Sequence, residues 1–204
     1  MGETAYRGVI FDFGGVLTTK IEDSAVEFEK REGLAPGTSG RALTSPAGRR
    51  LMELVEAGQI SQREWSRGFS ELLDLPPSDD LMGRMLAALR PAEQGLALAR
   101  GLRARGFRTA ILSNSFPLDP HDPYAPYELH ADFDAVVLSA DHLMRKPDPA
   151  IYELTLDLLG VPPRECVFVD DTAKNLDPAR DLGMQVVHAT DEQVTASALK
   201  SLLG

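Results

Sequence analysis

The sequence has only one cysteine, Cys166, among its 204 residues. One thiol cannot form a disulfide within the chain, so no disulfide framework holds this fold together. Cys166 lies in the apolar stretch Cys166–Val169, which has the composition of a buried strand. Because free cysteine is among the most buried residue types, we interpret it as core packing and not as a nucleophile.

Long apolar runs and an excess of positive charge are also missing. No run approaches the ~20 apolar residues that a membrane-spanning helix needs. Residues Met1–Arg7 lack the basic and apolar regions of a secretory signal. The formal net charge of −10 repels nucleic acid phosphates and anionic membranes. These absences predict a cytoplasmic protein that binds neither nucleic acid nor membrane. They leave both a monomer and a homodimer open.

Short, continuous apolar segments alternate with helical ones. Such segments are typical of strands buried on both faces of a parallel sheet. The helical segments between them end at glycines. This alternation predicts an α/β fold, a Rossmann-like parallel sheet of about five strands flanked by helices. The predicted strands are Tyr6–Phe11, Thr109–Leu112, Ala135–Leu138, Cys166–Val169 and Met184–Val187, and the helices between them Ala92–Arg105, Pro149–Leu159 and Thr172–Leu182.

Residues 19–90 interrupt this alternation, because they contain helical patterns only. Ser61 and Glu64 form a capping box at the start of one helix. The segment Gly33–Gly48 is rich in Gly, Ser, Thr and Pro, which predicts a mobile loop. We therefore predict an all-helical cap, residues 19–90, inserted into a core domain of residues 1–18 and 91–204. Its predicted helices are Asp23–Glu32, Pro46–Ala57, Gln62–Asp74 and Asp79–Leu89.

Carboxylate, hydroxyl and lysine side chains stand at or shortly after the carboxyl ends of the predicted strands. Because ligands bind at the carboxyl ends of strands in open α/β sheets, we expect these side chains to meet. Three carboxylates in one place require a cation, and Mg²⁺ typically takes one or two carboxylates, waters and a substrate phosphate. One carboxylate can act as a nucleophile while a lysine neutralises the phosphoryl group. The residues concerned are Asp12, Ser113, Lys146, Asp170 and Asp171.

Each of these residues alone has an ordinary use as a turn former, a helix cap or a surface lysine. Their order and common position are more specific. The segments around them resemble the four signature motifs of haloacid dehalogenase-like hydrolases, and the helical insertion stands where that superfamily places its type 1 cap. Val169–Met184 is also similar to the N-terminal phosphatase domain of mammalian soluble epoxide hydrolase, whose bacterial relatives include sugar-phosphate phosphatases. The four segments are Phe11–Leu17, Leu112–Ser115, Arg145–Pro149 and Val169–Asn175.

The resemblance implies a role for each matching position. Asp12 is the expected nucleophile, Asp170 acts through a metal-bound water, and Asn175 supports the acidic pair. Three further residues are expected to bind the phosphoryl group, namely Ser113, Asn114 and Lys146, the last of which also pairs with Asp12. The expected Mg²⁺ ligands are Asp12, Asp171 and the backbone carbonyl of Gly14.

One position departs from the pattern of the family. Most phosphatases of this superfamily carry a second aspartate two residues after the nucleophile, as general acid and base, and here that position is Gly14. General acid–base help is worth roughly 10²–10⁴-fold in rate. Turnover is therefore slow, or a water or a cap residue takes over this role.

Three functions remain open from the sequence. The leading hypothesis is a Mg²⁺-dependent phosphatase that hydrolyses a small phosphorylated metabolite through an aspartyl-phosphate. A binding protein that keeps the fold but is catalytically weak or idle is the first alternative. A 2-haloacid dehalogenase is less favoured, because those enzymes usually carry tyrosine at the position of Gly14 and need no metal. Arg145 either adds positive potential to the site or points outward.

Overall fold

The computed structural model describes residues 6–204. Its centre is a five-stranded sheet in the order β3-β2-β1-β4-β5, with every neighbouring pair parallel. The predicted strands and the α/β fold class are confirmed, with small shifts at the strand ends. The strands are β1 (Gly8–Phe11), β2 (Arg108–Ser113), β3 (Ala135–Leu138), β4 (Cys166–Asp170) and β5 (Gln185–His188).

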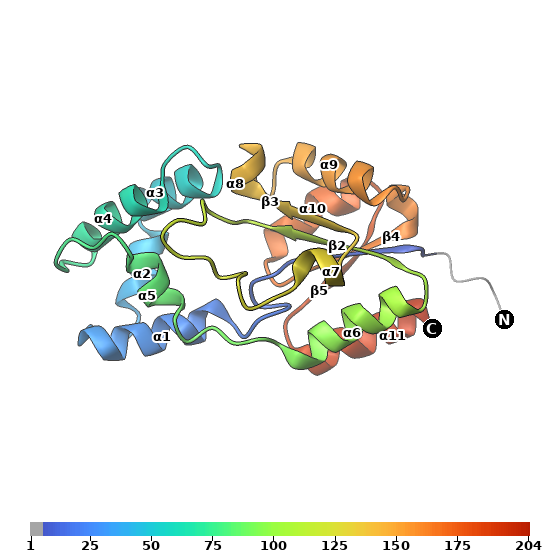
Figure 1. Cartoon of the computed structure of the whole chain (residues 1–204), viewed down its shortest axis with the longest axis horizontal. Helices are drawn as coiled ribbons and strands as arrows, with labels where there is room; N and C mark the ends of the chain where they lie inside the picture. Colours follow the sequence, from blue (N-terminus) through green and yellow to red (C-terminus); the bar gives the residue numbers. More distant parts are fainter. Residues whose placement is uncertain (1–5) are drawn as a thin grey trace.

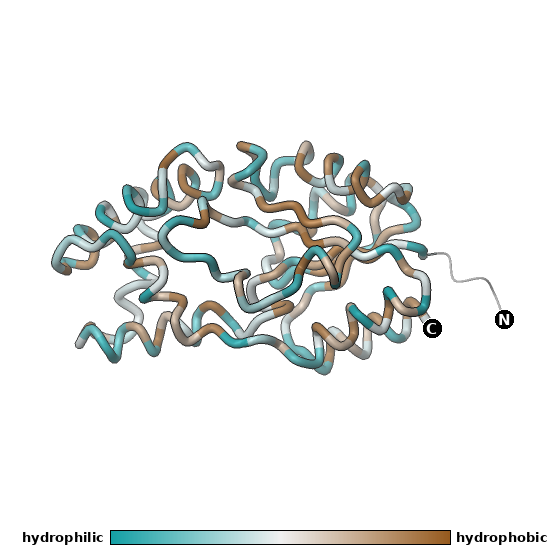
Figure 2. The backbone as a smooth tube through the Cα atoms, in the orientation of Figure 1, coloured by the Kyte–Doolittle hydropathy of each residue, from teal (hydrophilic) through white to brown (hydrophobic). Residues whose placement is uncertain are grey.

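Helices cover both faces of this sheet (Figure 1). The successive side chains of β1 point to opposite faces, so Val9 joins one apolar cluster and Ile10 the other. Burial on both faces explains why the strands are continuous apolar runs. Figure 2 shows this apolar centre. One face is covered by α6 (Glu93–Ala104) and α11 (Glu192–Leu203), and the other by α9 (Pro149–Leu159) and α10 (Ala173–Asp181).

The segment after β1 is all-helical, as predicted, and has a separate apolar core, to which Phe116 from the loop after β2 also contributes. Trp65 and Phe69 stack with ring centroids 4.7 Å apart at the centre of this core. The two connections to the sheet domain run side by side, with an isolated bridge between Thr18 and Pro91. This pairing supports residues 19–90 as the proposed limits of the cap. Its helices are α1 (Ile21–Glu32), α2 (Thr38–Thr44), α3 (Pro46–Glu56), α4 (Gln62–Leu72) and α5 (Leu81–Leu86).

The prediction of a loop over Gly33–Gly48 is wrong, because α2 and the first turn of α3 lie within it. The buried carboxylate of Glu29 organises this segment. It accepts hydrogen bonds from the Gly37 backbone N–H at 2.7 Å and from the Ser39 hydroxyl at 2.5 Å. Since Glu29 belongs to α1, the composition of the segment itself gave no sign of this anchor.

The sequence analysis also overlooked several helices, of which α11 is the longest. The Asp191 side chain caps α11 by accepting hydrogen bonds from two of its backbone N–H groups. Within residues 6–204, the structure contains no helix that has both the length and the apolar character to span a bilayer. The short helices are α7 (Leu129–Asp132), α8 (Ser139–His142) and the 3₁₀ turn Pro163–Glu165.

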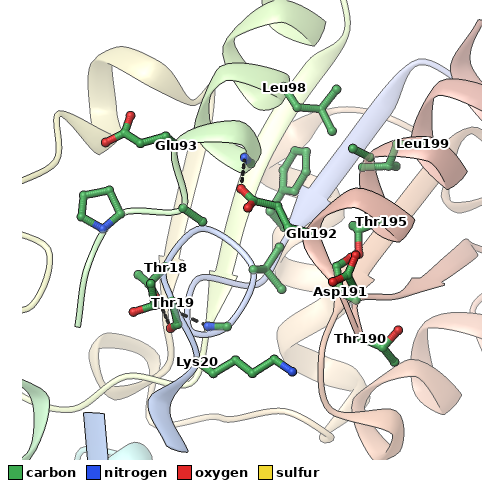
Figure 3. Close-up of a pocket in the computed structure, with 18 of the residues that line it drawn as sticks. Thr18, Thr19, Lys20, Glu93, Leu98, Thr190, Asp191, Glu192, Thr195 and Leu199 are labelled. Carbon is green, nitrogen blue, oxygen red and sulfur yellow. Dashed lines mark hydrogen bonds between the residues drawn. The ribbon is translucent and has the colours of Figure 1, made fainter. Parts of the chain in front are cut away.

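A cavity of about 320 Å³ lies where α6 and α11 begin, beside the chain from Thr18 to Lys20 (Figure 3). Glu192 closes one side of it, accepting a hydrogen bond from the Gly95 backbone N–H at 3.2 Å. Its walls contain none of the predicted site residues. This cavity is therefore lined by residues other than those with the predicted chemistry.

Candidate active site

The register of the sheet brings two of the predicted carboxylates together. Phe11 of β1 pairs with Val169 of β4, so Asp12 and Asp170 follow at the same edge. The chain runs from β1 to β2 and β3 on one side, and β4 and β5 lie on the other. The carboxylates thus stand where the strand order reverses, which is where open α/β sheets bind ligands.

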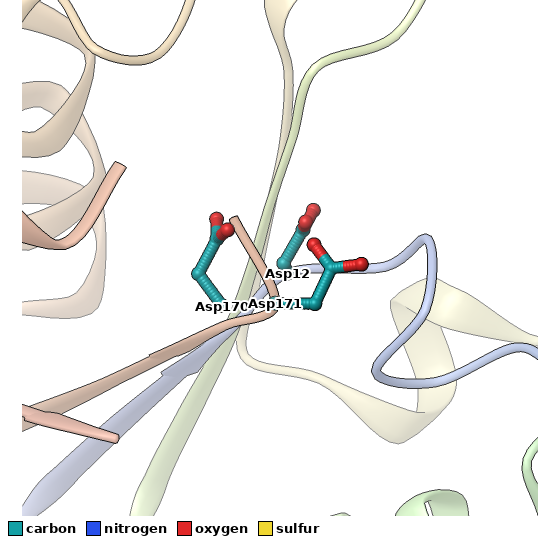
Figure 4. Close-up of side chains that lie close together, drawn as sticks. All are labelled: Asp12, Asp170 and Asp171. Carbon is teal, nitrogen blue, oxygen red and sulfur yellow. The ribbon is translucent and has the colours of Figure 1, made fainter. Parts of the chain in front are cut away.

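Asp171 completes the group (Figure 4). One oxygen from each of Asp12, Asp170 and Asp171 lies within 4.8 Å of the other two. Three carboxylates at this separation repel one another unless cations neutralise them.

Lys146 supplies one such cation. Its side chain is 1% exposed, and Nζ lies 2.8 Å from Asp12 Oδ1 and 2.6 Å from Asp170 Oδ2. Burial opposes the charge on this amine, but the two carboxylates outweigh burial and raise the pKa of Lys146. A buried charge is tolerated only when it is paired in this way.

Asp170 is fully buried, and both of its oxygens are used by protein donors. Oδ1 accepts from the Thr172 backbone N–H at 2.8 Å, and Oδ2 accepts from Lys146. The amide nitrogen of Asn175 lies 3.1 Å from each oxygen. Asp170 therefore orients its neighbours, and a metal could bind it directly only by displacing one of these donors.

Asp12 and Asp171 keep free oxygens. Asp12 Oδ1 accepts from Lys146 and from the Phe13 backbone N–H at 2.7 Å, and Asp171 Oδ1 accepts from the Thr172 hydroxyl at 3.0 Å. No hydrogen bond within residues 6–204 uses the Oδ2 atom of either carboxylate. Burial raises the pKa of Asp12 to about 7; Lys146 opposes this shift, and Asp170 and Asp171 add to it.

These residues fit a hard divalent cation. Mg²⁺ takes oxygen ligands, and the two free carboxylate oxygens belong to residues that the sequence predicted as metal ligands. Gly15 has φ +74°, and a Cβ there would lie 2.3 Å from Asp171 Oδ2, so glycine leaves room beside this oxygen. In the described part of the chain, the buried Oδ1 of Asn175 lacks a partner, as expected beside a site that also holds ordered water.

A cavity of about 240 Å³ opens above these carboxylates. The side chain of Asn114 fixes its wall, because Oδ1 accepts from the Lys146 backbone N–H at 2.8 Å. Ser113 lies outside the lining of this cavity in the described chain, and its hydroxyl is 2.9 Å from that of Tyr124. Of the predicted site residues, the lining includes Asp12, Gly14, Asn114, Lys146, Asp171 and Asn175.

Two other residues of the lining, Glu56 and Arg145, come from opposite sides of the boundary between cap and core. Glu56 ends α3, and its Oε2 accepts from Arg145 Nε at 2.7 Å. Arg145 therefore points into the site and not outward. The sequence analysis missed Glu56, although Gly58 nearby was a possible signal. Gly58 has φ +63°, and a Cβ there would lie 2.4 Å from the Ala140 carbonyl oxygen, so this turn packs closely on the core.

Curated proteins resemble the chain over nearly its whole length. It is 30% identical to mouse acyl-CoA dehydrogenase family member 10 over 100% of the chain, and 29% identical to pig bifunctional epoxide hydrolase 2 over 98%. It spans only 20% and 39% of those two proteins. A sesquiterpene phosphatase of Aspergillus oryzae is 29% identical, with 98% of both chains covered.

Solved structures share the fold. A HAD family enzyme of Bacteroides thetaiotaomicron, solved with magnesium and inorganic phosphate, matches with a TM-score of 0.72 at 22% identity, over 90% of this chain and 93% of that one. The family model described as haloacid dehalogenase-like hydrolase matches residues 6–183, which include all four motifs. The chain therefore belongs to the haloacid dehalogenase-like hydrolases.

Proposed function

We propose that this protein is a magnesium-dependent phosphatase that hydrolyses a small phosphorylated metabolite through an aspartyl-phosphate on Asp12. The convergence of Asp12, Asp170 and Asp171 around Lys146 carries the proposal. No packing requirement explains two buried carboxylates, a half-buried third and a buried lysine together at a ligand-binding edge. The relative from Aspergillus oryzae, a phosphatase by name, supports the same reaction class.

The chain's own residues account for the two displacements. One oxygen of the Asp12 carboxylate attacks phosphorus, the bond from phosphorus to the alcohol oxygen breaks, and the alcohol leaves. Water then attacks phosphorus, the bond to Asp12 breaks, and phosphate is released. Lys146 holds Asp12 in place and, together with Asn114, binds the phosphoryl group. The same role for Ser113 rests on the resemblance alone, because its hydroxyl contacts Tyr124 and lies outside the lining of the cavity.

Asp12, Asp171 and the Gly14 carbonyl would hold Mg²⁺, with Asp170 and Asn175 orienting its water. When bound there, the ion would supply positive charge to the oxygens of the phosphoryl group. The size and polarity of the cavity favour small, polar esters, because its volume is about 240 Å³ and Arg145 and Lys174 line it.

The test is a screen of the purified protein against phosphate esters, with Mg²⁺ and after exhaustive chelation, using Asp12→Asn as the blank. We expect phosphate release that depends on Mg²⁺ and on Asp12. Metal-independent halide release from 2-haloacids would replace the proposal with a dehalogenase. Binding of phosphate esters with no turnover in any condition would leave an idle binding protein.

A further inference from the structure

Phosphoryl transfer from an alkyl ester to Asp12 needs a proton for the departing alcohol oxygen, and Gly14 offers none. Two carboxyl groups besides Asp12 and Asp171 line the cavity, those of Glu22 and Glu56. Glu22 is exposed at the start of α1. The Glu56 side chain is only 14% exposed and belongs to the cap. Glu56 is therefore the better-placed candidate for the missing proton donor.

The surroundings of Glu56 hold it in one position. Its backbone carbonyl accepts a hydrogen bond from the Ser139 hydroxyl at 2.6 Å, which ties the end of α3 to the core. Its Oε2 lies 2.7 Å from Arg145 Nε, 2.5 Å from Arg145 Nη2 and 3.5 Å from Asn114 Nδ2. All three donors approach Oε2, and no hydrogen bond within residues 6–204 uses Oε1. One oxygen anchors the group, and the other is left for a ligand in the cavity.

We propose that Glu56 is the general acid and base of the reaction and replaces the carboxylate missing at Gly14. This rests on the phosphatase function proposed above. As the bond from phosphorus to the ester oxygen breaks, Glu56 gives its proton to that oxygen. The resulting Glu56 carboxylate then takes a proton from the water that attacks the aspartyl-phosphate. The cycle ends with Glu56 protonated again and needs no other reactant.

The charges around Glu56 favour both of its roles, donating a proton to the ester oxygen and accepting one from water. Burial raises its pKa, which increases the protonated fraction near neutral pH, while Arg145, Lys174 and Lys146 oppose the shift. Arg145 also stabilises the carboxylate that remains after the proton has left.

The test compares an aryl phosphate that has an acidic phenol with a simple alkyl phosphate that has no other hydroxyl. In Glu56→Gln we expect kcat/KM for the alkyl ester to fall by about 100-fold or more. The value for the aryl ester should change by less than about threefold, because an acidic phenol leaves unprotonated. Its kcat should still fall, with a burst of one phenol per site, because the second step has lost its base. The matched control is Glu53→Gln on the same helix, which should behave as the wild type.

Equal losses of kcat/KM on both esters would overturn the proposal, since a structural role does not depend on the leaving group. If Glu56→Gln fails to fold, the wild-type protein alone still tests the proposal, through kcat/KM for a series of esters with different leaving groups. A shallow dependence of kcat/KM on leaving-group pKa is expected, and a steep one contradicts a built-in donor. If the wild type and Glu53→Gln turn over neither ester with Mg²⁺, the proposed phosphatase function fails and this assignment with it.

Discussion

Two groups of polar residues lie beside the small cavity, and they are built differently. The buried cluster, Asp12, Lys146, Asp170 and Asn175, joins strand ends of the sheet domain through several hydrogen bonds, and Lys146 and Asp170 are 1% and 0% exposed. The cap pair, Glu56 and Arg145, is 14% and 24% exposed and is bonded through a single carboxylate oxygen. The hydrogen bonds of the buried cluster fix its side chains before any ligand binds. In the cap pair, Oε1 of Glu56 remains available to a ligand. We therefore expect changes in the buried cluster to affect every substrate, and changes in the cap pair to depend on the leaving group.

The largest effect is expected from Asp12→Asn. The amide is nearly isosteric but is not a nucleophile, so kcat should fall by about 10⁴-fold or more for every phosphate ester. Steady-state kinetics on the aryl and alkyl esters measure this, and circular dichroism checks the fold. The exposed Asp157 of α9 gives a matched control, Asp157→Asn, which should keep wild-type rates. If Asp12→Asn lost activity on alkyl esters only, Asp12 would behave as we expect of a proton donor and not as the nucleophile.

The next largest difference is expected in the free energy of unfolding, which a substitution in the buried cluster should lower more than one in the cap pair. Lys146→Met leaves two buried carboxylates without their cation, which costs about 3–5 kcal/mol of unfolding free energy. Arg145→Met breaks a pair that solvent partly screens, and we expect about 1 kcal/mol. Urea unfolding without metal measures both values. Similar losses in the two variants would show that the cap pair is as essential to the fold as the buried cluster.

A smaller effect concerns pH and metal. The pKa of Asp12 is raised to about 7, above its unfolded value of about 4, so ionising this group costs the folded state. The metal-free protein should therefore lose stability as pH rises from about 4 through 7. Mg²⁺ needs the ionised carboxylate, so it should raise Tm more at pH 8 than at pH 6. Thermal unfolding with and without Mg²⁺ tests this, and equal shifts at both pH values would contradict it.

The smallest effect is expected from Gly14→Asp. A Cβ at Gly14 would approach Ile21 Cδ1 at 2.8 Å, which is the movable end of a side chain, and Gly14 has no positive φ. In the wild type we expect a change of less than about threefold in alkyl ester turnover, because Glu56 already donates the proton. In the Glu56→Gln background the same substitution should restore part of the lost rate. A large gain in the wild type would mean that the site lacks a donor.

The buried cluster could be predicted from the sequence, and the physical reason is local. Asp12 and Asp170 end or directly follow apolar runs, and parallel strands deliver their carboxyl ends to one edge whatever their order in the sheet. Lys146 could be placed there only through the resemblance of its motif. The α11 helix could also have been predicted, because Asp191 followed by Glu192 is a helix start signal that we overlooked.

The cap pair could not be predicted in the same way. The position of Glu56 depends on how α3 docks against Ser139 and Arg145, which are more than 80 residues away in the chain. The same limit explains the error at Gly33–Gly48, where the Glu29 carboxylate orders a segment with the composition of a loop. Long-range polar contacts leave no periodic pattern in a sequence.

The account depends most directly on the covalent role of Asp12. The decisive measurement is acid quenching during turnover of the aryl phosphate in the Glu56→Gln variant, followed by peptide mass spectrometry. We expect the peptide that contains Asp12 to gain the mass of one phosphoryl group, and Asp12→Asn to lack this gain. An unmodified Asp12 while phosphate is being released, or a phosphoryl group on another residue, would contradict the account.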